Sequence, residues 1–361
     1  MSDHKCIFCG KDATNKTKEH VIPQWLIRMT GDHRRIANFG TDFNQIINSD
    51  GNKAVKPRMF SFNSLTFPAC RDCNEKYGKI LENNAFTILN KIMNEELISE
   101  TEIMHFMDWL DKIRIGLWLG FDILNQNPFD VKHKFYLEKR IGYHDRILLV
   151  YRASKNDLPN GINFIGPDTP AFAFLPCCLT IRINNFFFFN VSKENILLEK
   201  LGFPFLERFV LNNELNPIKI KINEGHKKIS TPILNFFTID TSVKIFQPIY
   251  KAYINDIDCN EEYIKNNSFN CKEGLGNIFS ENNHIVCHKK NIKLSPSSEF
   301  SGNELITLLS IQTFKTLRTL WDENIAAKFE NESTKQKVMS YYQLATETIS
   351  AYLKKINSFN Q

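Results

Sequence analysis

Two Cys-x-x-Cys pairs, Cys6/Cys9 and Cys70/Cys73, constrain the fold of this chain more than any other feature. Each pair can present two thiolates from one tight turn, and the glycine that follows the first pair, Gly10, suits the backbone of such a turn. Four soft ligands in tetrahedral geometry favour Zn²⁺, and a site closed by four thiolates has a structural role. We therefore expect one structural zinc. The alternatives are four unligated thiols or a redox pair.

The first 83 residues need such a metal because they are rich in breakers and poor in apolar residues. Binding of a structural zinc can contribute about 10–16 kcal/mol, most of which is expressed as folding. The chain begins Met-Ser-Asp-His-Lys-Cys, without the apolar core of a signal peptide. It also has no uncharged apolar run of about 18 residues. We expect a cytoplasmic protein with no membrane span, in which cysteines are metal ligands or free thiols.

The excess positive charge lies with the cysteine pairs. Residues 1–95 contain fourteen Lys or Arg and ten Asp or Glu, which is +4 of the chain's net +5. The rest of the chain is nearly neutral. This distribution favours a module that meets phosphates, and the alternative is a mildly basic surface with no binding role.

A Glu-His dyad lies between the two cysteine pairs, in the run Lys18-Glu19-His20-Val21-Ile22-Pro23, and Asn74 follows the second pair directly. With these elements at this spacing, residues 4–83 resemble the HNH endonuclease superfamily. The core of that superfamily is a β-hairpin followed by a helix, the ββα-metal fold. The resemblance covers under a quarter of the chain, and its specificity comes from the whole set of spaced elements.

The resemblance implies a role for each residue. His20 is the general base, and imidazole suits this role because it titrates near neutrality. Glu19 and Asn74 are ligands of a catalytic Mg²⁺ or Mn²⁺, since carboxylate and amide oxygens are hard ligands. Asn63 is the candidate for the residue that orients the histidine. Glu82 either supports the metal or begins the link to the next helix, and we favour the link.

The segment between His20 and Cys70 contains basic residues interleaved with Phe39, Phe43 and Phe60. These side chains can contact nucleic-acid backbone and bases, and the equal alternative is a solvated loop with packing aromatics. The basic candidates for nucleic-acid binding are Arg34, Arg35, Lys53, Lys56 and Arg58.

Beyond residue 83 the sequence predicts helices over 84–125 and 303–356, with a capping box formed by Ser99 and Glu102 at the second helix of the first region. Residues 140–255 are rich in aromatic and β-branched residues and predict strands, among them 171–180 and 181–191, with a turn at Asn184-Asn185. Residues 256–300 are Asn-rich and predict irregular structure. The fold class we expect is α+β, with a zinc-stabilised ββα-metal module over 1–83 and a mixed helix and strand domain over 84–361.

The function that we expect is a metal-dependent endonuclease that hydrolyses phosphodiester bonds in DNA, with a role in bacterial anti-phage defence or restriction. Residues 84–361 are expected to choose the target, dock a partner protein or regulate activity. Two alternatives stay open at this point. One is a non-catalytic, zinc-stabilised protein that binds nucleic acid, and the other is a toxin or effector that cuts RNA.

Overall fold

A computed structural model of the chain describes residues 5–31, 36–39, 58–124, 145–167, 172, 176–193, 205–211, 217–223, 243–249, 276–281, 284–287, 291–297, 299–324 and 336. These residues form both helices and strands, as expected for the α+β class. Among them, no helix combines the length and the apolar character that crossing a membrane requires.

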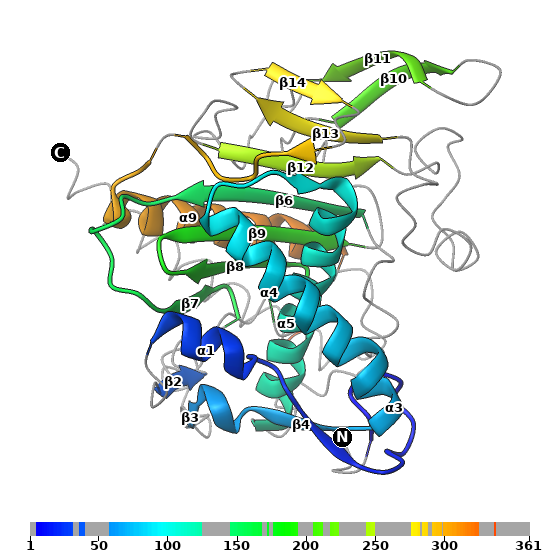
Figure 1. The fold of residues 1–361 in the computed structure, drawn as a ribbon, viewed down its shortest axis with the longest axis vertical. Helices are drawn as coiled ribbons and strands as arrows, with labels where there is room; N and C mark the ends of the chain where they lie inside the picture. The colour runs from blue at the N-terminus through cyan, green and yellow to red at the C-terminus, as the bar shows by residue number, and fades with distance from the viewer. Residues whose placement is uncertain are drawn as a thin grey trace.

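The centre of the structure is an antiparallel sheet of seven strands in the order β14-β13-β12-β6-β9-β8-β7 (Figure 1). Its strands are β6 (Asp145–Arg152), β7 (Ile162–Ile165), β8 (Cys178–Ile183), β9 (Phe186–Lys193), β12 (Val243–Ile249), β13 (Gly276–Glu281) and β14 (His284–Cys287). The turn between β8 and β9 falls at Asn184-Asn185, and Asn184 has a φ of 54°. Asparagine tolerates this left-handed conformation better than most residues, so the predicted turn is confirmed.

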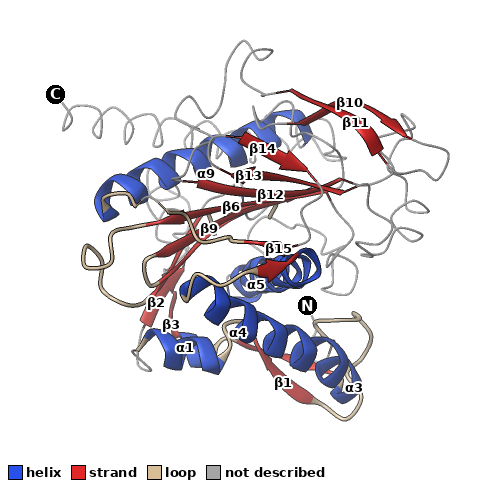
Figure 2. Cartoon of the chain, turned by 45° about the horizontal axis from the view of Figure 1, so that its top comes forward, coloured by secondary structure: helices blue, strands red, loops and turns tan. Residues whose placement is uncertain are grey.

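Helices cover both faces of the sheet (Figures 1 and 2). On one face, α5 (Glu100–Leu124) lies against the strands, and α4 (Ile80–Met93) packs on the outer side of α5. The ring of Phe106 on α5 lies 5.1 Å from that of Phe188 on β9. On the other face, Gln312 of α9 (Gly302–Asn324) accepts a hydrogen bond of 2.9 Å from the hydroxyl of Tyr151. The sheet is therefore a middle layer between helices.

The start of α5 has the predicted capping box. The backbone N–H of Ser99 donates to Glu102 Oε2 at 2.8 Å, and the backbone N–H of Glu102 donates to Ser99 Oγ at 3.3 Å. These two bonds satisfy N–H groups that a helix N-terminus otherwise leaves unpaired.

The N-terminal part lies beside α4 and α5 and consists of short elements. They are β1 (Thr17–His20), α1 (Gln24–Thr30), β2 (Ile36–Phe39), β3 (Arg58–Ser61), the 3₁₀ turn η1 (Phe62–Ser64), β4 (Thr66–Ala69), α3 (Arg71–Cys73) and the π-helical turn η2 (Asn74–Lys79). β1 pairs with β4 and β2 pairs with β3, both antiparallel. Away from this part, β5 (Ile98–Ser99) pairs with β15 (Asn291–Ile292), and β10 (Phe205–Leu211) pairs with β11 (Pro217–Asn223).

Two sequence predictions about secondary structure need correction. Residues 256–300 contain β13, β14 and β15, although their composition predicted irregular structure. The strand predicted to begin near Ala171 begins at Cys178, and Phe172 is helical. In both places the partner strand decides the structure, because β-propensity depends strongly on context. The predicted C-terminal helix is described as far as Asn324. Of its predicted continuation to residue 356, the structure describes residue 336 alone.

Helix α5 packs directly against the N-terminal part. A Cβ at Gly116 would lie 2.8 Å from Val21 Cγ1, closer than a side chain tolerates, so glycine is required for this approach. The buried hydrophobic residues form one cluster that includes Val21 and Ile22 of the N-terminal part, Trp109 of α5 and Phe188 of the sheet. Helix α5 is therefore enclosed on all sides.

Four buried charged residues join α5 to β6. Arg146 Nη1 lies 2.5 Å from Asp108 Oδ1 and 3.5 Å from Asp111 Oδ2. Arg114 Nη2 lies 2.8 Å from Asp111 Oδ1, and its Nη1 donates to the carbonyl of Pro176 at 2.6 Å. Burial raises the pKa of Asp108 to about 7, and the charge of Arg146 only partly offsets this. The network contains two arginines and two carboxyl groups, and Arg146 contacts both carboxyl groups.

We expect Arg146→Met to destabilise the protein by about 3–5 kcal/mol, because removal of one member of a buried ion pair leaves its partners uncompensated. Asp108→Asn should cost much less, about 1 kcal/mol, because burial already disfavours the charged carboxylate and the amide oxygen still accepts from Arg146. Urea unfolding of both variants measures the difference. Equal losses of stability in the two variants would contradict this account of the network.

Candidate functional site

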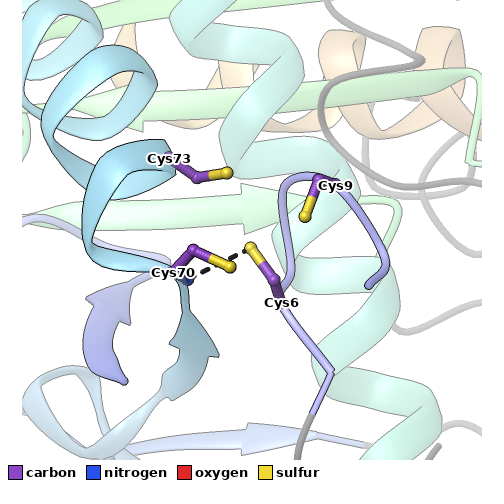
Figure 3. Close-up of side chains that lie close together, drawn as sticks. All are labelled: Cys6, Cys9, Cys70 and Cys73. Atoms are coloured by element: carbon purple, nitrogen blue, oxygen red, sulfur yellow. Dashed lines mark hydrogen bonds between the residues drawn. The ribbon is translucent and has the colours of Figure 1, made fainter. Parts of the chain in front are cut away.

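The four cysteines of the two pairs converge on one point (Figure 3). The first pair lies on a turn closed by Gly10, whose φ is 73° and whose N–H donates to the carbonyl of Cys6 at 2.9 Å. The second pair brackets α3, with Cys70 before its first residue and Cys73 as its last. The backbone N–H of Cys70 also donates to Cys6 Sγ at 3.3 Å, which ties one turn to the other.

The geometry of the cluster fits a metal ion. All four Sγ atoms lie within 4.8 Å of one another. Four thiolates about 2.3 Å from a tetrahedral zinc lie roughly 3.8 Å apart, so small rotations of the side chains suffice. Burial raises the pKa of Cys6, while hydrogen bonds from Thr14 lower the pKa of Cys70. The cluster can therefore hold a metal such as zinc, and it leaves no position open for a substrate.

Directly beside this cluster, β1 and β4 form an antiparallel pair of strands, with Glu19 opposite Phe67 and His20 opposite Thr66. The chain leaves β4 through Cys70 and enters α3, η2 and α4 without a break. Two paired strands are thus followed at once by a helix. Glu19 is buried and His20 is half-buried, because neighbouring residues of a strand point to opposite faces.

Asn74 begins the helical segment η2 and faces β1. Its Nδ2 donates to Thr17 Oγ1 at 3.0 Å, which fixes the orientation of the amide. A Cβ at Gly78, one helical turn later, would lie 2.4 Å from Asn74 Oδ1 and 2.9 Å from Glu19 Oε2. Both oxygens therefore lie beside the same backbone position, and only glycine leaves them room. Oxygens from a carboxylate and an amide are the ligands that Mg²⁺ and Mn²⁺ prefer.

The other oxygen of Glu19 contacts a buried lysine of α5 that the sequence analysis missed. Lys112 Nζ contacts Glu19 Oε1 and Glu82 Oε1, and it donates to the carbonyl of His20 at 3.3 Å. Lys112 is only 1% exposed. Burial by itself would lower the pKa of Lys112, but the carboxylates of Glu82 and Glu19 outweigh burial and raise it, so the ammonium stays charged.

Both carboxylate oxygens of Glu82 have side-chain partners in the structure. Glu82 lies on α4, and its Oε1 contacts Lys112. Its Oε2 accepts hydrogen bonds from Trp25 Nε1 at 2.6 Å and from Trp109 Nε1 at 3.3 Å. Two indoles and an ammonium therefore hold this carboxylate in place. The group formed by Glu19, Lys112 and Glu82 has a net charge of −1 when all three side chains are ionised.

Electrostatics keep His20 neutral near physiological pH. Burial lowers the pKa of its imidazole, and the positive charge of Lys112 lowers it further. Gln24 Nε2 lies 3.4 Å from His20 Nε2. A neutral imidazole can accept a proton. Burial raises the pKa of Glu19, and Lys112 pulls it partly back.

The remaining site predictions are only partly described. Asn63 lies exposed in η1, close in sequence to β4, and its role in orienting His20 stays a prediction. Arg34, Arg35, Lys53 and Lys56 lie outside the described residues, and Arg58 is described only as the first residue of β3. Other basic residues of the N-terminal part are exposed, although the sequence analysis did not select them. They are Lys11, Lys16, Lys18, Arg71, Lys76 and Lys79.

Comparison of the chain with protein-family models, with curated proteins and with solved structures found no match. The function is therefore argued from the arrangement of these residues.

Proposed function

We propose that this protein is a metal-dependent endonuclease of the HNH type that hydrolyses phosphodiester bonds in DNA. The observation that carries the proposal is that Glu19 Oε2 and Asn74 Oδ1 lie beside the same backbone position, Gly78, where η2 packs against the strand that also holds His20. The antiparallel strand pair followed by a helix, with a four-cysteine cluster at their junction, supports the same assignment.

The chemistry of the donor atoms supports a catalytic Mg²⁺ or Mn²⁺ in addition to the zinc. Glu19 Oε2 and Asn74 Oδ1 are two hard acceptors beside the same backbone position, Gly78, and the net charge of −1 on Glu19, Lys112 and Glu82 favours a cation there. When bound there, such an ion would polarise the scissile phosphate and stabilise the departing 3′ oxygen.

His20 acts as the general base in this mechanism. Its neutral imidazole takes a proton from the attacking water as the new bond from oxygen to phosphorus forms. The bond between phosphorus and the 3′ oxygen then breaks, which leaves a 5′ phosphate and a 3′ hydroxyl. The carbonyl of His20 is held by Lys112, so the backbone that carries the base is fixed.

Charge on the surface supports a nucleic-acid substrate. Lys18 lies on β1 beside Glu19, and Lys76 and Lys79 lie on η2 on either side of Gly78. All three side chains are exposed and can neutralise phosphates on both sides of the scissile bond. We propose that residues 84–361 select the target or dock a partner, and that the protein acts in bacterial anti-phage defence or restriction.

One observation favours a second candidate, a nucleic-acid-binding protein that does not cut. Lys112 contacts one oxygen of Glu19, as it would if an ion pair had replaced a metal. Two facts favour the nuclease. Glu82 balances the charge of Lys112, and Glu19 Oε2 still faces Asn74. The two candidates differ in whether a divalent metal binds and cleavage follows.

Gly78→Ala tests the proposal because the added methyl group meets both proposed ligand oxygens. Alanine favours a helix over glycine, so the variant should keep its fold and its zinc. We expect Mn²⁺ affinity and Mn²⁺-dependent cleavage of supercoiled plasmid to fall by at least about tenfold. The matched control is Glu75→Ala on the exposed side of the same helical turn, which should stay within about twofold of the wild type. Unchanged affinity for Mn²⁺ in Gly78→Ala would show that the metal does not bind at the oxygens of Glu19 and Asn74.

A further inference from the structure

Lys112 is the residue at which the helical layer meets the proposed metal site. One ammonium group contacts three acceptors: Glu19 Oε1, Glu82 Oε1 and the carbonyl of His20. An ammonium has three protons to donate, so each acceptor can receive one. Both members of the Glu19-His20 dyad are therefore held by a single side chain that lies 92 residues further along the chain than His20.

This contact determines which oxygen of Glu19 is available. A carboxylate is planar, so holding Oε1 at Lys112 restricts where Oε2 can lie. In the structure Oε2 lies next to Gly78, where Asn74 Oδ1 also lies. Thr17 orients the amide of Asn74 in a comparable way from β1. A second residue therefore orients each of the two proposed ligands: Lys112 orients Glu19, and Thr17 orients Asn74.

The charge of Lys112 does not cancel the negative charge of the site. Glu82 supplies the second carboxylate, and the indoles of Trp25 and Trp109 hold Glu82 against Lys112. A lone lysine would neutralise Glu19 and weaken its attraction for a cation. With Glu82 present, the three side chains retain a net charge of −1.

We propose that Lys112 is a positioning residue of the nuclease site: it orients Glu19 for the divalent metal and fixes the backbone of His20, and Glu82 is its counter-charge. This inference rests on the proposed function. Helix α5 also carries Asp108 and Asp111, which pair with Arg146 of the central sheet. The geometry of the proposed metal site is thereby tied through one helix to the central sheet of seven strands.

Lys112 could instead form a purely structural ion pair with no effect on the metal. A double substitution distinguishes that role from the positioning role. Lys112→Met alone leaves two buried carboxylates uncompensated, which by itself threatens the fold. Lys112→Met combined with Glu82→Gln leaves Glu19 as the single charge, so the net charge stays at −1. The glutamine oxygen can still accept from both indoles. The double variant therefore removes the positioning contact while it preserves the charge.

The matched control is Lys91→Met combined with Glu102→Gln. This pair also joins α4 to α5, with Lys91 Nζ 2.5 Å from Glu102 Oε1, but it has no contact with Glu19 or His20 in the described structure. Glutamine also serves at this position of a capping box, so the start of α5 is preserved.

The experiment titrates Mn²⁺ into zinc-loaded protein, follows free Mn²⁺ by electron paramagnetic resonance, and measures plasmid cleavage in parallel. Zinc content and thermal unfolding report on the fold. We expect the Lys112/Glu82 variant to bind Mn²⁺ roughly 10–100-fold more weakly than the wild type, as for residues that orient metal ligands. The cleavage rate at saturating DNA should fall with it, and the Lys91/Glu102 variant should match the wild type. Lys112→Arg, which keeps the charge but not the compact ammonium, should also bind Mn²⁺ more weakly.

Two results would overturn the inference in different ways. Wild-type affinity for Mn²⁺ in both the Lys112/Glu82 variant and Lys112→Arg would refute the positioning role and leave the nuclease intact. A wild-type protein that neither binds Mn²⁺ nor cleaves would refute the proposed function and, with it, this role of Lys112.

Discussion

Replacement of Cys70 by serine is expected to abolish stoichiometric zinc binding and to unfold the N-terminal part of the protein. Cys70 lies at the centre of the cluster: its thiol accepts from the N–H of Thr14, and its N–H donates to Cys6 Sγ. It is also the residue through which β4 enters the helical segment that carries Asn74. A structural zinc contributes about 10–16 kcal/mol, so loss of one ligand removes a large share of the stability of this short segment.

Elemental analysis and thermal unfolding measure this effect. The wild type should contain one zinc per chain, and Cys70→Ser much less, with a lower unfolding temperature. Cys177→Ala is the matched control, because Cys177 is fully buried in the core outside the cluster. The control should keep its zinc and lose only the modest free energy of a small cavity. A Cys70→Ser protein that still holds one zinc per chain would show that the four thiols are not the ligands.

Substitution of His20 by alanine is expected to lower the rate of DNA cleavage by at least about 100-fold, since a positioned general base contributes about 10²–10⁴-fold. Burial and Lys112 lower the pKa of His20, so the base is neutral at the pH of the assay. Mn²⁺ affinity should change little, because Glu19 and Asn74 remain. His105→Ala is the control: this histidine has similar burial but lies on α5, where Asn84 Nδ2 approaches its Nδ1 at 3.5 Å. Equal losses of cleavage rate in His20→Ala and His105→Ala would show that the substitutions act through protein stability and not through loss of the base.

The cysteine cluster could be predicted from the sequence because the information is local. Two ligands from each tight turn need only the Cys-x-x-Cys spacing and a glycine such as Gly10, and chemistry then favours one tetrahedral metal. The capping box at Ser99 and the hairpin turn at Asn184 are local in the same sense. Prediction succeeds where a few neighbouring residues determine the backbone.

The contacts of Lys112 could not be predicted in this way, because its partners come from β1 and α4 and the pairing exists only once the chain is folded. One signal was nevertheless present. In α5, apolar residues surround the helix rather than covering one face, as Trp109, Leu110 and Ile115 illustrate. A helix that is apolar all round is buried, and charged residues within it must then be paired. Asp108, Asp111, Lys112 and Arg114 were therefore candidates for buried ion pairs.

Glu82 illustrates the same limit. Its spacing from Asn74 suggested either a second metal ligand or the beginning of a link between helices. The structure instead pairs it with Lys112 and with two indoles that come from α1 and α5. Strands β13 and β14 were missed for a related reason. β13 pairs with β12 and β14 pairs with β13, and this pairing makes them strands although their composition does not favour it.

The central claim is tested most directly by incubating zinc-loaded wild-type protein with supercoiled plasmid, with Mn²⁺ or Mg²⁺ and without either, beside His20→Ala. The account predicts nicked or linear DNA only with the wild type and an added divalent metal. The new ends should be sealed by DNA ligase without prior treatment, since they carry a 5′ phosphate and a 3′ hydroxyl. Intact plasmid under every metal condition, cleavage of RNA alone, or equal cleavage by His20→Ala would contradict the account.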